Sequence, residues 1–194
     1  MNKLWRSSLL AAGLCAASSS FAASTENADE AALMERVNGF YSWVLKNGKQ
    51  VDQLQPVIRD IPRSKKFVLD TRHLKAFTSK FIASGHFAPG FPALVNSYYD
   101  KYRQQFAAYS DAEFAQIARD GRGPLMDTED MDIFFCAQEY EYTKDFISKM
   151  KPKTVKVDGD QGSMTVVSDY QWETEFRFVR LNGKWLIAGY CVFK

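Results

Sequence analysis

Residues 172–193 read WETEFRFVRLNGKWLIAGYCVF, with Asn182-Gly183 between two runs of β-branched or aromatic residues. Asn-Gly between such runs is the strongest short signal for a tight β-hairpin, because both residues adopt positive φ at low cost. Two similar runs, 154–157 and 163–168, come earlier and are separated by turn-forming residues. The sequence therefore predicts an antiparallel meander of about four strands in the C-terminal third of the chain.

The chain before this meander has helical periodicity. A first helix is predicted to begin after Asn27, which has Glu30 at the capping-box spacing, and to stop at Asn47-Gly48. Its apolar residues recur three or four positions apart, as one buried helix face requires. They are Leu33, Val37, Phe40, Tyr41, Val44 and Leu45.

Three further helices are expected before the meander. Asp70 is placed to cap the second, Pro92 lies near the start of the third, and a Ser-x-x-Glu capping box precedes the fourth, Asp111–Arg119. Residues 49–69 contain two prolines and are expected to form a loop with at most a short helix. Helices followed by a meander predict an α+β domain, with the helices packed on one face of the sheet.

The N-terminus has the pattern of a secretory signal peptide. Lys3 and Arg6 supply the positive region, residues 9–17 form a short apolar run, and Ser20 and Ala22 are the small residues of a cleavage site. Cleavage after Ala22 would leave a single periplasmic domain, residues 23–194. The apolar run is too short for a permanent membrane span, and no later segment is long and apolar enough to be one.

Charge and motif content exclude several functions. Residues 23–194 hold 23 basic and 23 acidic residues, because Lys3 and Arg6 lie in the leader, and a nucleic-acid binder would need a basic excess. The chain has no glycine-rich nucleotide motif, and its two histidines lie apart from any hydrolase nucleophile motif. We therefore expect no cofactor and no metal.

Two cysteines remain outside the leader. Cys15 lies within it, and Leu14 stands where a lipoprotein signal needs a small residue. Cys136 and Cys191 are expected to pair in an oxidising compartment, closing a loop of about 56 residues worth roughly 4 kcal/mol. Two buried free thiols are the alternative.

Three motifs together resemble a family of small exported bacterial domains of unknown function. These are FYSWVL at 40–45, DMDIFFCAQ at 130–138 and GKWLI at 183–187. The family is related to the nuclear transport factor two-like, or cystatin-like, cone superfamily. The resemblance covers 30–50 and 125–194. It implies a curved antiparallel sheet wrapped around the first helix, and it implies no particular activity. The stretch 86–122 lies outside the resemblance and is expected to be an inserted helical arm.

Acidic and tyrosine residues are the candidate partner-binding groups. Asp127, Glu129 and Asp130 form an acidic patch with Asp132, although the spacing does not match a calcium-binding EF-hand. Residues 59–80 are correspondingly basic, so the two stretches either pair with each other or face partners. Tyr98 and Tyr102 belong to a tyrosine stripe on the third helix, which is either a recognition surface or a packing face.

Asp132 is the best candidate for a general acid or base. If 132–138 is extended, Asp132, Phe134, Cys136 and Gln138 point to one side. Ketosteroid-isomerase-like cones use a carboxylate and a tyrosine for proton transfer, and Asp132 with Tyr140 or Tyr142 is similar to that pair. The alternative is a buried aspartate that bonds to backbone or arginine groups.

Three functions remain open. The leading hypothesis is a non-catalytic periplasmic binding protein with a protein partner, such as an immunity or inhibitor protein for a toxin or envelope enzyme. The second is a cone that binds or isomerises a small molecule with Asp132 as general base. The third is an accessory protein of an envelope complex. The oligomeric state is open in all three.

The leader makes a direct prediction about the secreted form. Expression of the full chain in a Gram-negative host is expected to yield periplasmic protein whose N-terminal residue is Ala23, measured by intact mass and N-terminal sequencing. Ala22→Leu, which removes the small residue at the cleavage site, is expected to leave the leader attached. Unprocessed wild-type protein in the cytoplasm would contradict the periplasmic assignment.

Overall fold

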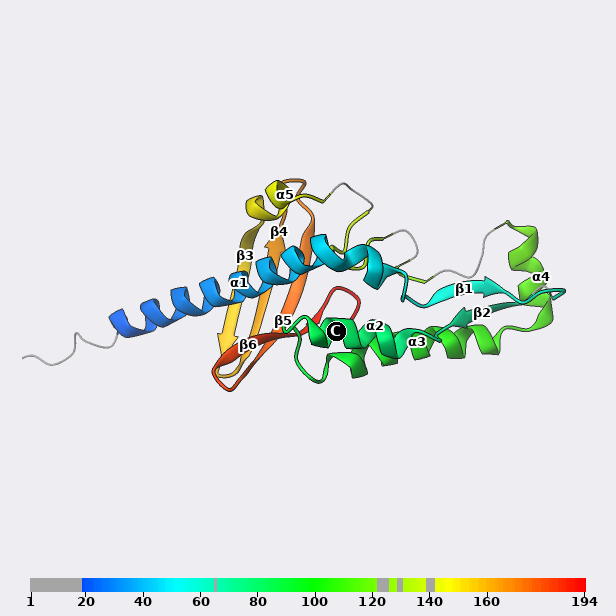
Figure 1. The fold of residues 1–194 in the computed structure, drawn as a ribbon, viewed down its shortest axis with the longest axis horizontal. Coiled ribbons are helices and arrows are strands. Elements are labelled where there is room, and N and C mark those ends of the chain that lie inside the picture. Colours follow the sequence, from blue (N-terminus) through cyan, green and yellow to red (C-terminus); the bar gives the residue numbers. More distant parts are fainter. Residues whose placement is uncertain (1–18, 65, 122–125, 129–130, 139–141) are drawn as a thin grey trace, which may run out of the picture.

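The computed structural model describes residues 19–64, 66–121, 126–128, 131–138 and 142–194. It is an α+β fold with antiparallel sheets (Figure 1). The helices are α1 Ser19–Asp52, α2 Leu74–Ala83, α3 Phe91–Ala108, α4 Asp111–Arg119 and α5 Lys144–Lys149. The strands are β1 Val57–Asp60, β2 Phe67–Asp70, β3 Lys151–Asp158, β4 Gln161–Val167, β5 Glu173–Leu181 and β6 Lys184–Tyr190. Among the described residues, no helix is both long and apolar enough to cross a membrane.

The larger sheet has the strand order β3-β4-β5-β6, and each neighbouring pair is antiparallel. Asn182 and Gly183 make the β5–β6 turn with φ of 51° and 73°, as the Asn-Gly signal predicts. Alternate residues of these strands are buried on one face. The buried set includes Met164, Val166, Phe176, Phe178, Ile187 and Tyr190.

Helix α1 packs on this apolar face of the sheet (Figure 1). Phe40 and Tyr41 are fully buried, and the Phe40 ring meets Tyr190 of β6 edge-on at 5.2 Å. The helix starts earlier and ends later than expected, so Asn27 is not its cap and Asn47-Gly48 does not stop it. The buried side chain of Val51, which is 1% exposed, explains the extra turn at the C-terminal end.

A polar network attaches α1 to the β5–β6 hairpin. Arg180 donates to both carboxylate oxygens of Asp29 at 2.7 and 2.8 Å, and Trp185 Nε1 donates to the same carboxylate at 3.0 Å. The Arg180 guanidinium also lies over the Trp185 ring, 4.2 Å from its centroid. The charges are partly buried and geometrically fixed, and such pairs stabilise more than exposed ones.

The free edge of β6 is covered by residues 86–88. Ala88 N donates to Ile187 O at 2.8 Å, and Ile187 N donates to His86 O at 2.9 Å, which makes a short parallel pairing. The His86 ring lies against Gly39 of α1, where an added Cβ would come within 2.6 Å of the ring. Residues 86–88 therefore close the sheet edge and fix α1 against it.

Helices α3 and α4 and the β1–β2 hairpin extend away from the sheet as an arm, with α2 at its base, whereas α5 lies at the end of the sheet near β3 and β4 (Figure 1). Helix α4 has the predicted bounds, and its Ser110–Glu113 capping box is present. The stretch 49–69, expected to form a loop, instead holds the end of α1 and most of the β1–β2 hairpin, whose Leu69 is buried and whose β2 packs on α3. The second helix begins at Leu74, and Asp70 pairs with Arg59 and Arg72 instead of capping it.

The free energy of unfolding is expected to depend on pH through His86, with lower stability at lower pH. Burial lowers the pKa of His86, and the nearby positive charges of Arg36 and Lys184 lower it further. The unfolded chain therefore binds a proton more readily than the folded chain does. The resulting loss of stability begins as pH falls through about 6.5, the ordinary histidine value, and is complete below the native pKa.

We expect the urea midpoint of the wild-type protein to fall between about pH 7.5 and pH 5. His86→Gln is expected to reduce this fall, because the substituted side chain cannot take up the proton. His73→Gln, which changes an exposed histidine before α2, is the matched control and is expected to keep the wild-type slope. Equal slopes for wild type and His86→Gln would refute the assignment.

Candidate functional site

Residues 132–137 form a closed turn, which we call the plug loop. Asp132 N donates to Ala137 O, and Cys136 N donates to Asp132 O, each at 2.8 Å. The Asp132 carboxylate accepts from the backbone N–H groups of Phe134 and Phe135 at 2.8 and 3.0 Å. The expectation that 132–138 is extended is therefore wrong, because Asp132 satisfies the backbone donors of a turn.

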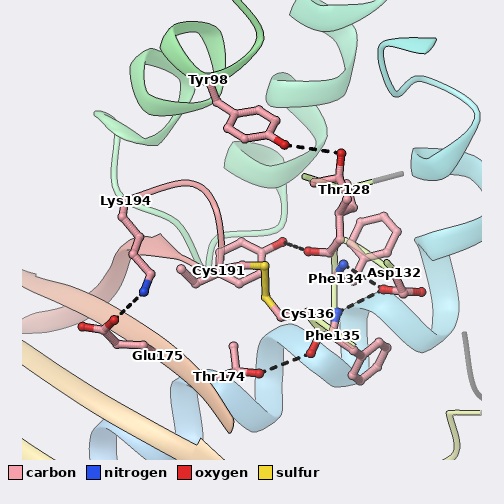
Figure 2. Close-up of a disulfide and its surroundings, with 12 residues drawn as sticks. Tyr98, Thr128, Asp132, Phe134, Phe135, Cys136, Thr174, Glu175, Cys191 and Lys194 are labelled. Carbon is pink, nitrogen blue, oxygen red and sulfur yellow. Dashed lines mark hydrogen bonds and ion pairs between the residues drawn. A yellow bond between two sulfur atoms is a disulfide. The ribbon is translucent and has the colours of Figure 1, made fainter. Parts of the chain in front are cut away.

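The plug loop places three consecutive apolar residues in the core (Figure 2). Ile133, Phe134 and Phe135 are each less than 5% exposed. The sheet binds the loop backbone directly, since Tyr190 donates to Ile133 O at 2.9 Å and Thr174 donates to Phe135 O at 3.2 Å. The loop thus fills the space that α1 and the sheet leave open.

The predicted disulfide between Cys136 and Cys191 is confirmed, and it fastens the plug loop to the end of β6 (Figure 2). Both cysteines have positive φ, 55° and 56°, which non-glycine residues adopt only where the surroundings require it. Lys194 and Glu175 form an ion pair beside the bond. The disulfide and the two side-chain hydrogen bonds therefore fix the loop at several points.

Tyr98 and Tyr102 belong to the packing face of α3 and are 8% and 3% exposed. Their hydroxyls hold the segment 126–128, since Tyr98 donates to Thr128 Oγ1 at 3.5 Å and Asp127 N donates to the Tyr102 hydroxyl at 3.2 Å. Burial raises the pKa of Tyr98 above its usual range. The structure thus favours the packing alternative for these two tyrosines over recognition of a partner.

Asp127 of the acidic patch is exposed, and its Oδ2 lies 3.6 Å from Nζ of Lys101 in α3, so the two side chains form an ion pair. Glu129 and Asp130 lie outside the described residues, and so does Tyr140. Within the described part of the chain, no group of three or more His, Cys, Asp or Glu residues could hold a metal ion.

A groove of about 1300 Å³ lies beside the plug loop, between the C-terminal half of α1 and residues 126–128, 131–138 and 142. One wall is α1, with Leu45, Lys46 and Lys49. The opposite wall includes Met126 and Met131, and Phe134, Phe135, Asp132 and Tyr142 also line the groove. No residue of β3–β6 lines it, so it lies outside the helix–sheet core.

Gly48 lies on α1 beside the plug loop and lines the groove. A Cβ at this position would lie 3.2 Å from Val44 Cγ1, one turn earlier in the same helix, and 3.9 Å from the Phe134 ring, which is an ordinary van der Waals contact. The close approach of Phe134 therefore does not require glycine at this position. The same glycine explains why the predicted end of the helix is too early, since α1 continues to Asp52.

The candidate acid–base groups take part in holding the site together. Asp132 accepts two backbone N–H groups, and Tyr142 donates to Gln138 O at 2.8 Å while its ring stacks on Phe135 at 3.7 Å. Tyr41, also near Asp132, is fully buried, and burial raises its pKa well above the usual range. These hydrogen bonds hold one wall of the groove in place, and the lining combines apolar side chains with two lysines and two aspartates.

The turn formed by Asp132 yields a stability prediction. Asp132→Ala is expected to lower the free energy of unfolding by about 1–3 kcal/mol, because two buried backbone donors lose their acceptor. Asp132→Asn keeps one acceptor oxygen and is expected to recover at least half of the loss. Urea denaturation of the oxidised protein measures both, and an Asp132→Ala variant as stable as wild type would contradict the capping role.

Comparison with known proteins gives no further guide: no protein-family model, no curated protein and no solved structure matches this chain.

Proposed function

We propose that this protein is an exported periplasmic binding protein without catalytic activity, and that the groove beside the plug loop holds part of a protein partner. The single observation that carries the proposal is that Asp132 and Tyr142, the candidate catalytic groups, hold the loop in place by hydrogen bonds to the backbone. The groove beside them offers a partner apolar side chains and the exposed Lys46 and Lys49.

The lining suits a polypeptide better than a small metabolite. Met126, Met131 and Leu45 supply flexible apolar surface, and methionine-rich surfaces adapt to the side chains of protein partners. The groove is also open and larger than the roughly 300–1000 Å³ of a usual small-molecule pocket. An immunity or inhibitor protein, which acts by occupying its partner, is the form of this function that we favour.

The cone superfamily remains part of the proposal. A long helix packed on the apolar face of a four-stranded antiparallel sheet is consistent with it, as are the three motifs that suggested the resemblance. In this interpretation α1 and the plug loop fill the cone, and the partner binds at its margin instead of inside it.

The test is a pull-down from periplasmic extract with the processed, tagged protein. Lys46→Glu with Lys49→Glu changes two exposed groove lysines, and Lys151→Glu with Lys156→Glu makes the same charge change on exposed residues of β3. We expect the groove variant to lose the partner at least about tenfold, equivalent to 1.4 kcal/mol, and the β3 variant to retain it.

Two results would contradict the proposal. One is a partner that binds both double variants as it binds wild type, which would place the interface elsewhere. The other is a turnover reaction that depends on the Asp132 carboxylate and is lost in Asp132→Asn. Thermal unfolding of each variant checks that loss of binding does not reflect loss of the fold.

A further inference from the structure

The backbone of β1 has an outward-facing edge. β1 pairs with β2 in the register Val57↔Asp70 to Asp60↔Phe67, and Ile61 N donates to Lys66 O at 2.9 Å, which continues the register. Residues of an antiparallel ladder alternate between bonding their partner strand and pointing away from it. The bond at Ile61 therefore directs the backbone groups of Ile58 and Asp60 away from β2.

These outward groups have no partner in the described part of the chain. The small sheet contains only β1 and β2, so no third strand pairs with β1 there. An unpaired row of N–H and C=O groups is a template for another strand, which proteins usually cover or block. Lysines and prolines that commonly block such edges are absent from Val57–Asp60 itself.

The groove meets β1 at the N-terminal end of the strand. Val57 and Ile58 line the groove together with Gln55 and Pro56, which come just before the strand, whereas Arg59 and Asp60 are not among the lining residues. A segment bonded to the outward groups of Ile58 and Asp60 that continues past the start of β1 would therefore enter the groove, whose apolar lining includes Leu45, Met126 and Met131.

Two lysines of the groove indicate which charge the partner's segment carries. Lys46 and Lys49 are exposed on the α1 wall, and neither forms an ion pair in the described structure. The two carboxylates that line the groove, Asp52 and Asp132, accept hydrogen bonds from neutral N–H groups and keep their negative charges, so the lining as a whole has no net formal charge. The positive charge is local to Lys46 and Lys49, which are free to pair with an acidic residue of an incoming chain.

We infer that β1 binds an extended segment of the protein partner as an added strand, with apolar residues in the groove and an acidic residue at Lys46 and Lys49. Main-chain hydrogen bonds to Ile58 and Asp60 would supply affinity, and the alternate side chains would supply specificity. This inference rests on the proposed function and specifies the form in which the partner binds.

The experiment uses the full oxidised protein to select binders from a library of random displayed peptides. Peptides of about 12 residues are used, because at about 3.3 Å per residue an extended peptide of this length can pair with β1 and continue into the groove. We expect the selected peptides to alternate apolar residues with a period of two and to carry acidic residues. Peptides with a helical period of three to four, or no selected sequence at all, would overturn the inference.

Asp60 allows a matched pair of variants. Asp60→Pro removes both the carboxylate and the outward N–H, whereas Asp60→Ala removes only the carboxylate, and proline is tolerated where the N–H of an edge strand faces outward. We expect the affinity of a selected peptide to fall about tenfold for Asp60→Pro relative to Asp60→Ala. Equal affinities would overturn the inference.

If Asp60→Pro unfolds, hydrogen exchange on the wild-type protein tests whether a bound peptide pairs with β1. The amides of Ile58 and Asp60 are expected to exchange fast in the free protein and to become protected with the selected peptide bound. Unchanged exchange at both would overturn strand addition. If Lys46→Glu with Lys49→Glu abolishes partner binding while Asp60→Pro binds like Asp60→Ala, the groove function stands and only strand addition fails.

Discussion

The structure depends on covering one apolar face of a four-stranded sheet. Such a sheet is not stable with its aromatic face in water, because transfer of each large apolar side chain from water to the core contributes about 1.5–3 kcal/mol to the free energy of folding. Helix α1 supplies the main cover, and residues 86–88 and the plug loop fill the margins. Phe40 illustrates this convergence, since its ring contacts Phe81, Phe87 and Tyr190 from three separate segments.

Local chemistry explains which elements the sequence could predict. The Asn182-Gly183 turn and the Ser110–Glu113 capping box depend on residues only a few positions apart, so their signals are complete within a short window. The Cys136–Cys191 bond could be predicted for a different reason, because only two cysteines remain outside the proposed leader. In each case the deciding interaction was visible without knowledge of distant packing.

The errors occurred where tertiary contacts override local signals. Gly48 is a typical helix end in isolation, but α1 continues past it to Asp52, where the side chain of Val51 is buried. The β1 and β2 strands have only four residues each, and they form because Leu69 packs on α3. The candidate site also combines local and distant contributions. Asp132 could be selected from its residue type alone, whereas the position of its turn and the groove depend on contacts between distant segments.

The length of α1 joins the two ends of the molecule mechanically. Asp29 meets Arg180 and Trp185 near one end, and Lys49 lines the groove near the other, about 30 Å away at 1.5 Å per residue. The helix is continuous between them, so a change in its direction at the groove would also shift Asp29 relative to the sheet. Trp185, whose indole N–H bonds to Asp29, is therefore placed where its fluorescence would report such a shift.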